Sequence, residues 1–131
     1  MSTSFVEYHG HGFWSFDDYL EHVLSLLADR IGSSPDQRWL ADVRDHWRNQ
    51  SSGAFRGWIH PNLDEFITSV ERCEKVLSLL KEIKSQAGLT REAQETIRLL
   101  DSLLRGKIST DASSPLDYMV SGPLPYTRGE D

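Results

Sequence analysis

The sequence contains a single cysteine, Cys73, among 131 residues. One thiol excludes an intrachain disulfide framework and every zinc site that needs several cysteine ligands. Long apolar runs are missing too: no stretch approaches the roughly 20 apolar residues that cross a bilayer, and the first residues lack the pattern of a secretory signal. These absences predict a protein of a reducing compartment, most simply the cytoplasm, with no membrane partner.

Basic residues are scarce: 14 lysines and arginines oppose 20 acidic residues, which gives a net charge of -6. A surface of this sign repels phosphate groups, so direct binding of nucleic acid is not expected. Residues 1–29 contain no lysine or arginine at all, and this part of the surface should be uniformly negative. Its acidic residues are Glu7, Asp17, Asp18, Glu21 and Asp29.

Apolar residues at helical spacing occupy most of the chain and predict four helices. Ser15, Asn62 and Thr90 are suitable caps, Pro35 suits a first helical position, and Gly32 is placed to close the first helix. The expected ranges are 15–31, 35–50, 62–87 and 90–106.

Strand signals are limited to residues 4–8 and 55–59. The sequence therefore predicts an all-α fold, a four-helix bundle-like single domain over residues 1–108, with an irregular tail over 109–131 that packs partly on it. The apolar face of the third helix is wide enough to indicate more than one neighbour, and Leu77 and Leu80 belong to it.

Signatures of catalysis are missing as well. The chain has no Gly-x-Ser-x-Gly elbow and no glycine-rich phosphate loop with its lysine, and Cys73 falls on the inward face of the third helix. A buried cysteine behaves mainly as a small apolar residue. We therefore expect a protein that is not an enzyme and needs no cofactor.

Three histidines, His9, His11 and His22, keep a metal-binding alternative open. Histidines at such spacing occur in zinc and copper sites, but a site also needs converging ligands and supporting hydrogen bonds. No cysteine joins them, so no metal site is expected.

Residues 53–67 combine a glycine-flanked aromatic turn with an acidic helix start, Asp64 and Glu65. Acids in a first turn commonly serve only to oppose the helix dipole, and Trp39, Trp47 and Trp58 are more typical of a core. An exposed tryptophan, however, would be a natural binding hot spot. If the two acidic helix starts lie side by side, they form one patch suited to a basic protein partner.

A family resemblance joins these segments. His-Gly-Phe-Trp-Ser at 11–15, Leu20-Glu21, Trp47 and Gly-Trp-Ile-His-Pro-Asn-Leu-Asp-Glu-Phe-Ile at 57–67 resemble small bacterial immunity proteins of polymorphic and contact-dependent growth inhibition toxin systems. The resemblance covers residues 8–80 and implies a stoichiometric inhibitor that binds a cognate toxin domain, a nuclease being one candidate.

The charge map and this resemblance together predict the partner-binding residues. They are Asp17, Asp18, Glu21, Asp64 and Glu65, with Trp14 or Trp58 as an apolar anchor. Two alternatives stay open: a small helical protein that binds a metal or ligand, and an adaptor that inhibits nothing.

Overall fold

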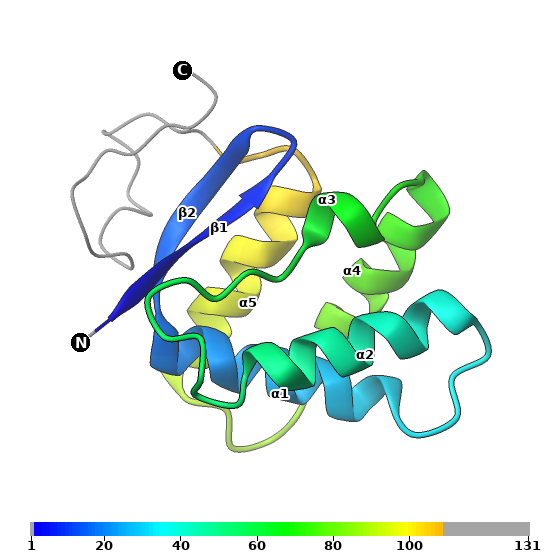
Figure 1. Ribbon diagram of the computed structural model, residues 1–131, viewed down its shortest axis with the longest axis horizontal. Helices are drawn as coiled ribbons and strands as arrows, with labels where there is room; N and C mark the ends of the chain where they lie inside the picture. The colour runs from blue at the N-terminus through cyan, green and yellow to red at the C-terminus, as the bar shows by residue number, and fades with distance from the viewer. Residues whose placement is uncertain (1, 109–131) are drawn as a thin grey trace.

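The chain begins with a β-hairpin (Figure 1). The computed structural model describes residues 2–108, so the expected tail, 109–131, lies outside the described residues. Strands β1 (Thr3–Tyr8) and β2 (His11–Phe16) pair antiparallel, with Phe5 opposite Trp14 and Val6 opposite Phe13.

A two-residue turn joins the strands. His9 and Gly10 both have positive φ, 52° and 82°. This is the backbone that two-residue hairpin turns require, because its twist matches that of the flanking strands. Along β1, buried and half-buried residues alternate, with Ser4, Val6 and Tyr8 on the inner face.

The all-α prediction is therefore wrong. Within residues 2–108, 57% of the residues are helical, in five helices, and two strands form one antiparallel sheet. This is a mixed α and β architecture. The error lies in residues 11–16: Ser15 resembles a helix cap, but it is a strand residue opposite Ser4. The hairpin turn also places a non-glycine residue, His9, at positive φ, which sequence patterns rarely indicate.

The first two helices begin later than expected. α1 (Asp17–Ile31) starts where β2 ends, and Gly32 closes it with a φ of 80°, as predicted. α2 (Arg38–Gln50) begins three residues after the expected start at residue 35.

The predicted helix over 62–87 is divided in two. α3 (Leu63–Phe66) ends at Ile67, whose φ of -101° and ψ of 81° leave the helical region. α4 (Val70–Lys84) begins anew after Ser69, whose hydroxyl accepts a hydrogen bond from the amide of Arg72 at 3.2 Å. A local cap thus overrides a continuous apolar pattern.

The last helix agrees with its prediction. α5 (Arg91–Leu104) is capped by Thr90, whose hydroxyl accepts from the amide of Ala93 at 3.1 Å. Its buried residues include Ile97, Leu100 and Leu103, which recur every three residues on one face.

One hydrophobic core is shared by the helices and the hairpin. α1 contacts α2, α4 and α5, while the hairpin contacts α5 through β2 and α3 through β1. Trp47, Leu20, Leu24 and Leu80 are among the largest fully buried side chains. None of the helices within residues 2–108 is long and apolar enough to span a membrane.

Candidate partner-binding surface

Asp17, at the start of α1, is completely buried. Its carboxylate accepts hydrogen bonds from the Ser4 hydroxyl at 2.6 Å, the Gly57 amide at 2.6 Å and the Ser2 hydroxyl. The position also suits a negative charge, because the first turn of a helix presents unpaired amide groups. Asp17 therefore joins β1, α1 and the segment after α2, and it has no surface with which to touch a partner.

Ser4 extends this network. Its buried hydroxyl donates to Asp17 and accepts from the amide of Ile59 at 2.9 Å. The backbone amides on both sides of Trp58 are thus held, directly or through Ser4, by one carboxylate.

Asp18 and Glu21 share a cation, Arg56, which the sequence reasoning missed. One guanidinium nitrogen lies 2.5 Å from the Asp18 carboxylate and 2.9 Å from that of Glu21. The hydrogen bond to Asp18, with the nearby charge of Glu21, raises the pKa of Arg56 above its usual value. The other Glu21 carboxylate oxygen, Oε2, is buried without a hydrogen-bond partner within residues 2–108. Arg56 therefore offsets part of the expected negative charge.

Trp58 lies on the surface of this segment, with 72% of its area exposed. Its amide donates to the Phe55 carbonyl at 2.9 Å, and the two rings lie 6.5 Å apart. Gly57 has a φ of 92°, a left-handed conformation that turns the chain here. The core interpretation of Trp58 is wrong, whereas Trp47 is buried as expected.

The segment is also fastened to α2. The His60 amide donates to the Gln50 side chain at 2.7 Å, and the Trp47 indole donates to the Pro61 carbonyl at 2.8 Å. The ring nitrogen Nε2 of His46 contacts the His60 carbonyl at 2.7 Å. Residues 57–61 therefore have a fixed backbone although they form neither helix nor strand.

Asp64 and Glu65 lie at the far end of the same segment. Asp64 accepts from the backbone amide of His9 at 3.0 Å, and Glu65 accepts from the Asn62 side chain at 3.2 Å. Asp17 contacts β1 at Ser4 and Asp64 contacts the turn after it, a separation of five residues or roughly 16 Å of strand. The two acidic helix starts are therefore at opposite ends of β1 and do not form one compact patch.

Trp14 lies on the outer face of the hairpin. It is partly buried, and its ring meets that of Phe5 edge to face at 5.3 Å. This contact across the two strands stabilises the hairpin, as aromatic cross-strand pairs do. Of the two predicted anchors, Trp58 is the exposed one.

The three histidines of the metal-binding alternative are not brought together. His9 lies in the hairpin turn and stacks on Tyr8, and His11 begins β2. His22 is an exposed residue of α1, beyond the other end of β2. No group of three or more potential ligands that could hold a metal ion occurs within residues 2–108.

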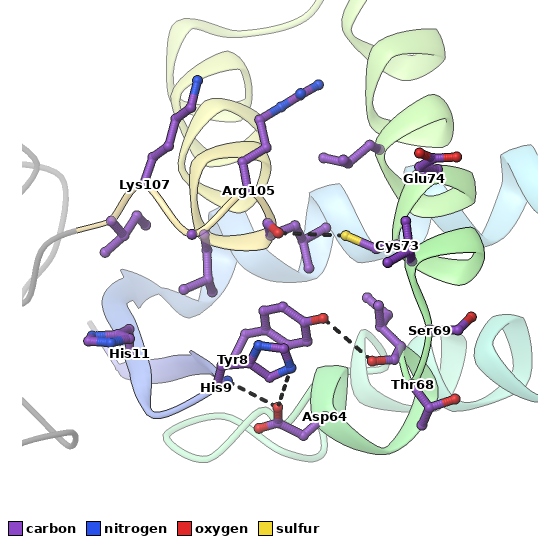
Figure 2. Close-up of a pocket in the computed structure, with 17 residues that line it drawn as sticks. Tyr8, His9, His11, Asp64, Thr68, Ser69, Cys73, Glu74, Arg105 and Lys107 are labelled. Carbon is purple, nitrogen blue, oxygen red and sulfur yellow. Dashed lines mark hydrogen bonds and ion pairs between the residues drawn. The ribbon is translucent and has the colours of Figure 1, made fainter.

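A groove of about 990 Å³ opens between the hairpin turn, the start of α4 and the end of α5 (Figure 2). Cys73 lies in it, with its thiol 3.6 Å from the Leu104 carbonyl, and burial raises the pKa of this thiol. Tyr8 also lines it and points its hydroxyl toward the Ile67 carbonyl at 3.5 Å. Residues 67–69, where the predicted third helix is divided, are part of the lining of this groove.

Comparison of the chain with protein-family models, with curated proteins and with solved structures finds no match.

Proposed function

We propose that this protein is an immunity protein that binds a cognate bacterial toxin domain in the cytoplasm and neutralises it as a one-to-one complex. Residues 55–65, which we call the Trp58 strip, form the core of the proposed interface. The exposed, rigidly held Trp58 is the observation that carries this proposal.

A large exposed indole on a fixed backbone is what a binding hot spot requires. Tryptophan is enriched among residues that dominate binding energy, and a backbone ordered before binding lowers the entropy lost on association. The flanking amides of Gly57 and Ile59 are both hydrogen-bonded to the fold. A partner pocket would therefore receive Trp58 without reorganising the loop.

The Trp58 strip is short enough to lie within one ordinary interface. It follows β1 from Ser4 to His9, roughly 16 Å, whereas a standard interface covers about 800 Å² on each partner. One partner can therefore contact Trp58 and the exposed acids Asp64 and Glu65 together. Asp18 borders the strip through its ion pair with Arg56.

The charge of the strip favours a basic partner surface. Asp64 and Glu65 are exposed: Asp64 contacts the backbone and ring of His9, and Glu65 contacts the Asn62 side chain. Within residues 2–108, neither carboxylate forms an ion pair with a lysine or arginine. A toxin that cleaves nucleic acid would present such a basic surface, because its groove must attract phosphates. Acids at the strip would then accelerate association and select against neutral partners.

The test is co-expression with the toxin domain encoded by the adjacent reading frame, followed by titration of the purified pair. We expect protected growth, a one-to-one complex, and a loss of at least about 30-fold in affinity on Trp58→Ala, as for a hot spot of about 2 kcal/mol. Val70→Ala is the matched control, because Val70 is 73% exposed but lies on α4. Equal affinities for wild type and Trp58→Ala would refute the Trp58 strip as the interface.

Two outcomes would favour the alternatives instead. A complex that forms without protecting growth would indicate an adaptor. A stoichiometric transition metal in untagged protein, lost when His9 and His11 are replaced, would indicate the metal-binding protein.

A further inference from the structure

The groove beside α4 exposes a second apolar row of that helix (Figure 2). Val70, Cys73 and Leu77 are spaced three and four residues apart, so they share one face. The neighbouring side of the helix, which carries Val76, Leu79 and Ile83, belongs to the buried core. The apolar residues of α4 thus form two adjoining surfaces: one packs in the core, and the other lines the groove and is not covered by any segment within residues 2–108.

The exposure of Val70 is the strongest indication that another segment covers this surface. It is 73% exposed and, with Trp58, is one of two large exposed apolar residues among the described ones. Exposed apolar surface rimmed by polar groups marks sites of interaction. Ser69, Glu74 and Arg105 provide such a rim here.

The chain itself runs into this groove. Ile108, the last described residue, lines the groove, and 23 further residues follow it. Among these, the segment Leu-Asp-Tyr-Met-Val at 116–120 has four apolar residues in five positions. The eight residues from Ile108 to Leu116 reach up to about 27 Å, whereas the row from Val70 to Leu77 is about 10 Å long. The linker from Ile108 is therefore long enough for residues 116–120 to reach the row from Val70 to Leu77.

Charge and tethering both favour this segment. Asp117 stands between the apolar residues, and Lys107 lies at the α5 edge of the groove beside Arg105, which pairs with Asp101. A segment joined by a short linker has an effective concentration in the millimolar range, so even a weak intrinsic affinity gives high occupancy. An unconnected peptide has no such advantage.

We propose that the groove between the hairpin turn, α4 and α5 binds residues 116–120 of the same chain, with Tyr118, Met119 and their neighbours covering Val70, Cys73 and Leu77. This contact is separate from the Trp58 strip, and it stands or fails independently of the proposed immunity function.

Cys73 makes the test direct, because it is the only thiol and lies under the proposed contact. The experiment measures the alkylation rate of Cys73 in the full-length folded chain at a single pH, with hydrogen exchange of residues 109–131 in parallel. With a millimolar effective concentration and an intrinsic Kd of about 0.1 mM, release of the segment should raise the alkylation rate about tenfold. Protected amides should be found within residues 116–120.

Two neutral variants remove the contact from either side without altering charge near the thiol. Val70→Ser changes the groove, and Tyr118→Ser combined with Met119→Ser changes the segment. Each should give the tenfold rise and the loss of amide protection, and combining them should add little further. Trp58→Ala is the control that should change neither measurement.

Three results would overturn the proposal. The first is unprotected exchange throughout residues 109–131 of the wild type. The second is an alkylation rate that neither variant changes, with unchanged circular dichroism showing that both are folded. The third is a wild-type rate that falls as protein concentration rises, which would assign the groove to a second copy of the chain.

Discussion

Asp17→Asn is the most informative substitution in this protein, because it preserves shape and removes only charge and one acceptor. Asp17 is completely buried and accepts three hydrogen bonds, from Ser2, Ser4 and Gly57. The asparagine amide has one acceptor oxygen, so its NH2 group must face either the Ser4 hydroxyl or the Gly57 amide, which are both donors. Facing Ser4, the NH2 group leaves the Ser4 hydroxyl proton without its acceptor; facing Gly57, it leaves both the Gly57 amide and the Ser2 hydroxyl without theirs.

The magnitude follows from these bonds. A hydrogen bond to a charged group contributes about 1.5 to 3 kcal/mol and a neutral one about 0.5 to 1.5 kcal/mol. Loss of the favourable charge at the start of α1 adds about 0.3 to 1 kcal/mol. Relief of the cost of burying a carboxylate acts in the opposite direction. We expect a net loss of about 2 to 4 kcal/mol in the free energy of unfolding.

Urea denaturation followed by circular dichroism measures this loss. Asp29→Asn is the matched control, because Asp29 is on the same helix, its side chain is 69% exposed, and its ion pair with Arg48 is long, at 3.6 Å. This substitution should change stability by less than about 0.5 kcal/mol. Hydrogen exchange should also accelerate at Gly57 and Ile59, which depend on Asp17 and Ser4. A loss below about 1 kcal/mol, with unchanged exchange at both amides, would refute the role assigned to Asp17.

Three further predictions concern the core, the thiol and the charge of the Trp58 strip. Leu80→Ala should lower the free energy of unfolding, measured by urea denaturation, by about 2 to 5 kcal/mol because Leu80 is 1% exposed. Leu77→Ala should lower it less because Leu77 is partly buried, and the reverse order would mean that the inward side of α4 is misassigned. Burial raises the pKa of Cys73, so less thiolate is present at neutral pH, and alkylation of Cys73 by iodoacetamide should be slower than that of a free thiol. The alkylation rate should continue to rise at pH values where that of a free thiol has levelled off, and an early plateau would contradict this. Glu65→Lys should slow association with the toxin domain and reduce its salt dependence, since the Glu65 side chain is exposed and its carboxylate accepts a hydrogen bond from the neutral Asn62 side chain. An unchanged association rate at low salt would exclude electrostatic attraction at this position.

Local signals were sufficient for the ends of several helices. Thr90 caps α5 and Gly32 closes α1 as predicted, because a cap depends on residues within one turn of the chain. The cap at Ser69 was equally local, but the apolar pattern through residues 67–70 concealed it. The predicted third helix therefore ran through a real boundary.

The second strand of the hairpin was missed for a different reason. β2 has six residues, too few for alternation to stand out against helical spacing, and its pairing with β1, as of Trp14 with Phe5, is a contact across the turn. Strand pairing depends on the partner as much as on the strand's own residues. The strand signal at residues 4–8 was correct, whereas the predicted first helix began at residue 15, inside β2.

The sequence by itself determined the net charge, the number of thiols, the positions of most helices and the list of aromatic and acidic candidates. Only the tertiary structure decided which of these candidates are accessible. Asp17 is buried by Ser4 and Gly57, which are 13 and 40 residues away, and Arg56 offsets Glu21 across 35 residues. Trp58 is exposed because its backbone is held against β1 while its ring is not. Hydrophobic periodicity reports on neighbours three or four residues apart, so burial, ion pairing and exposure that arise between distant segments are decided by packing alone.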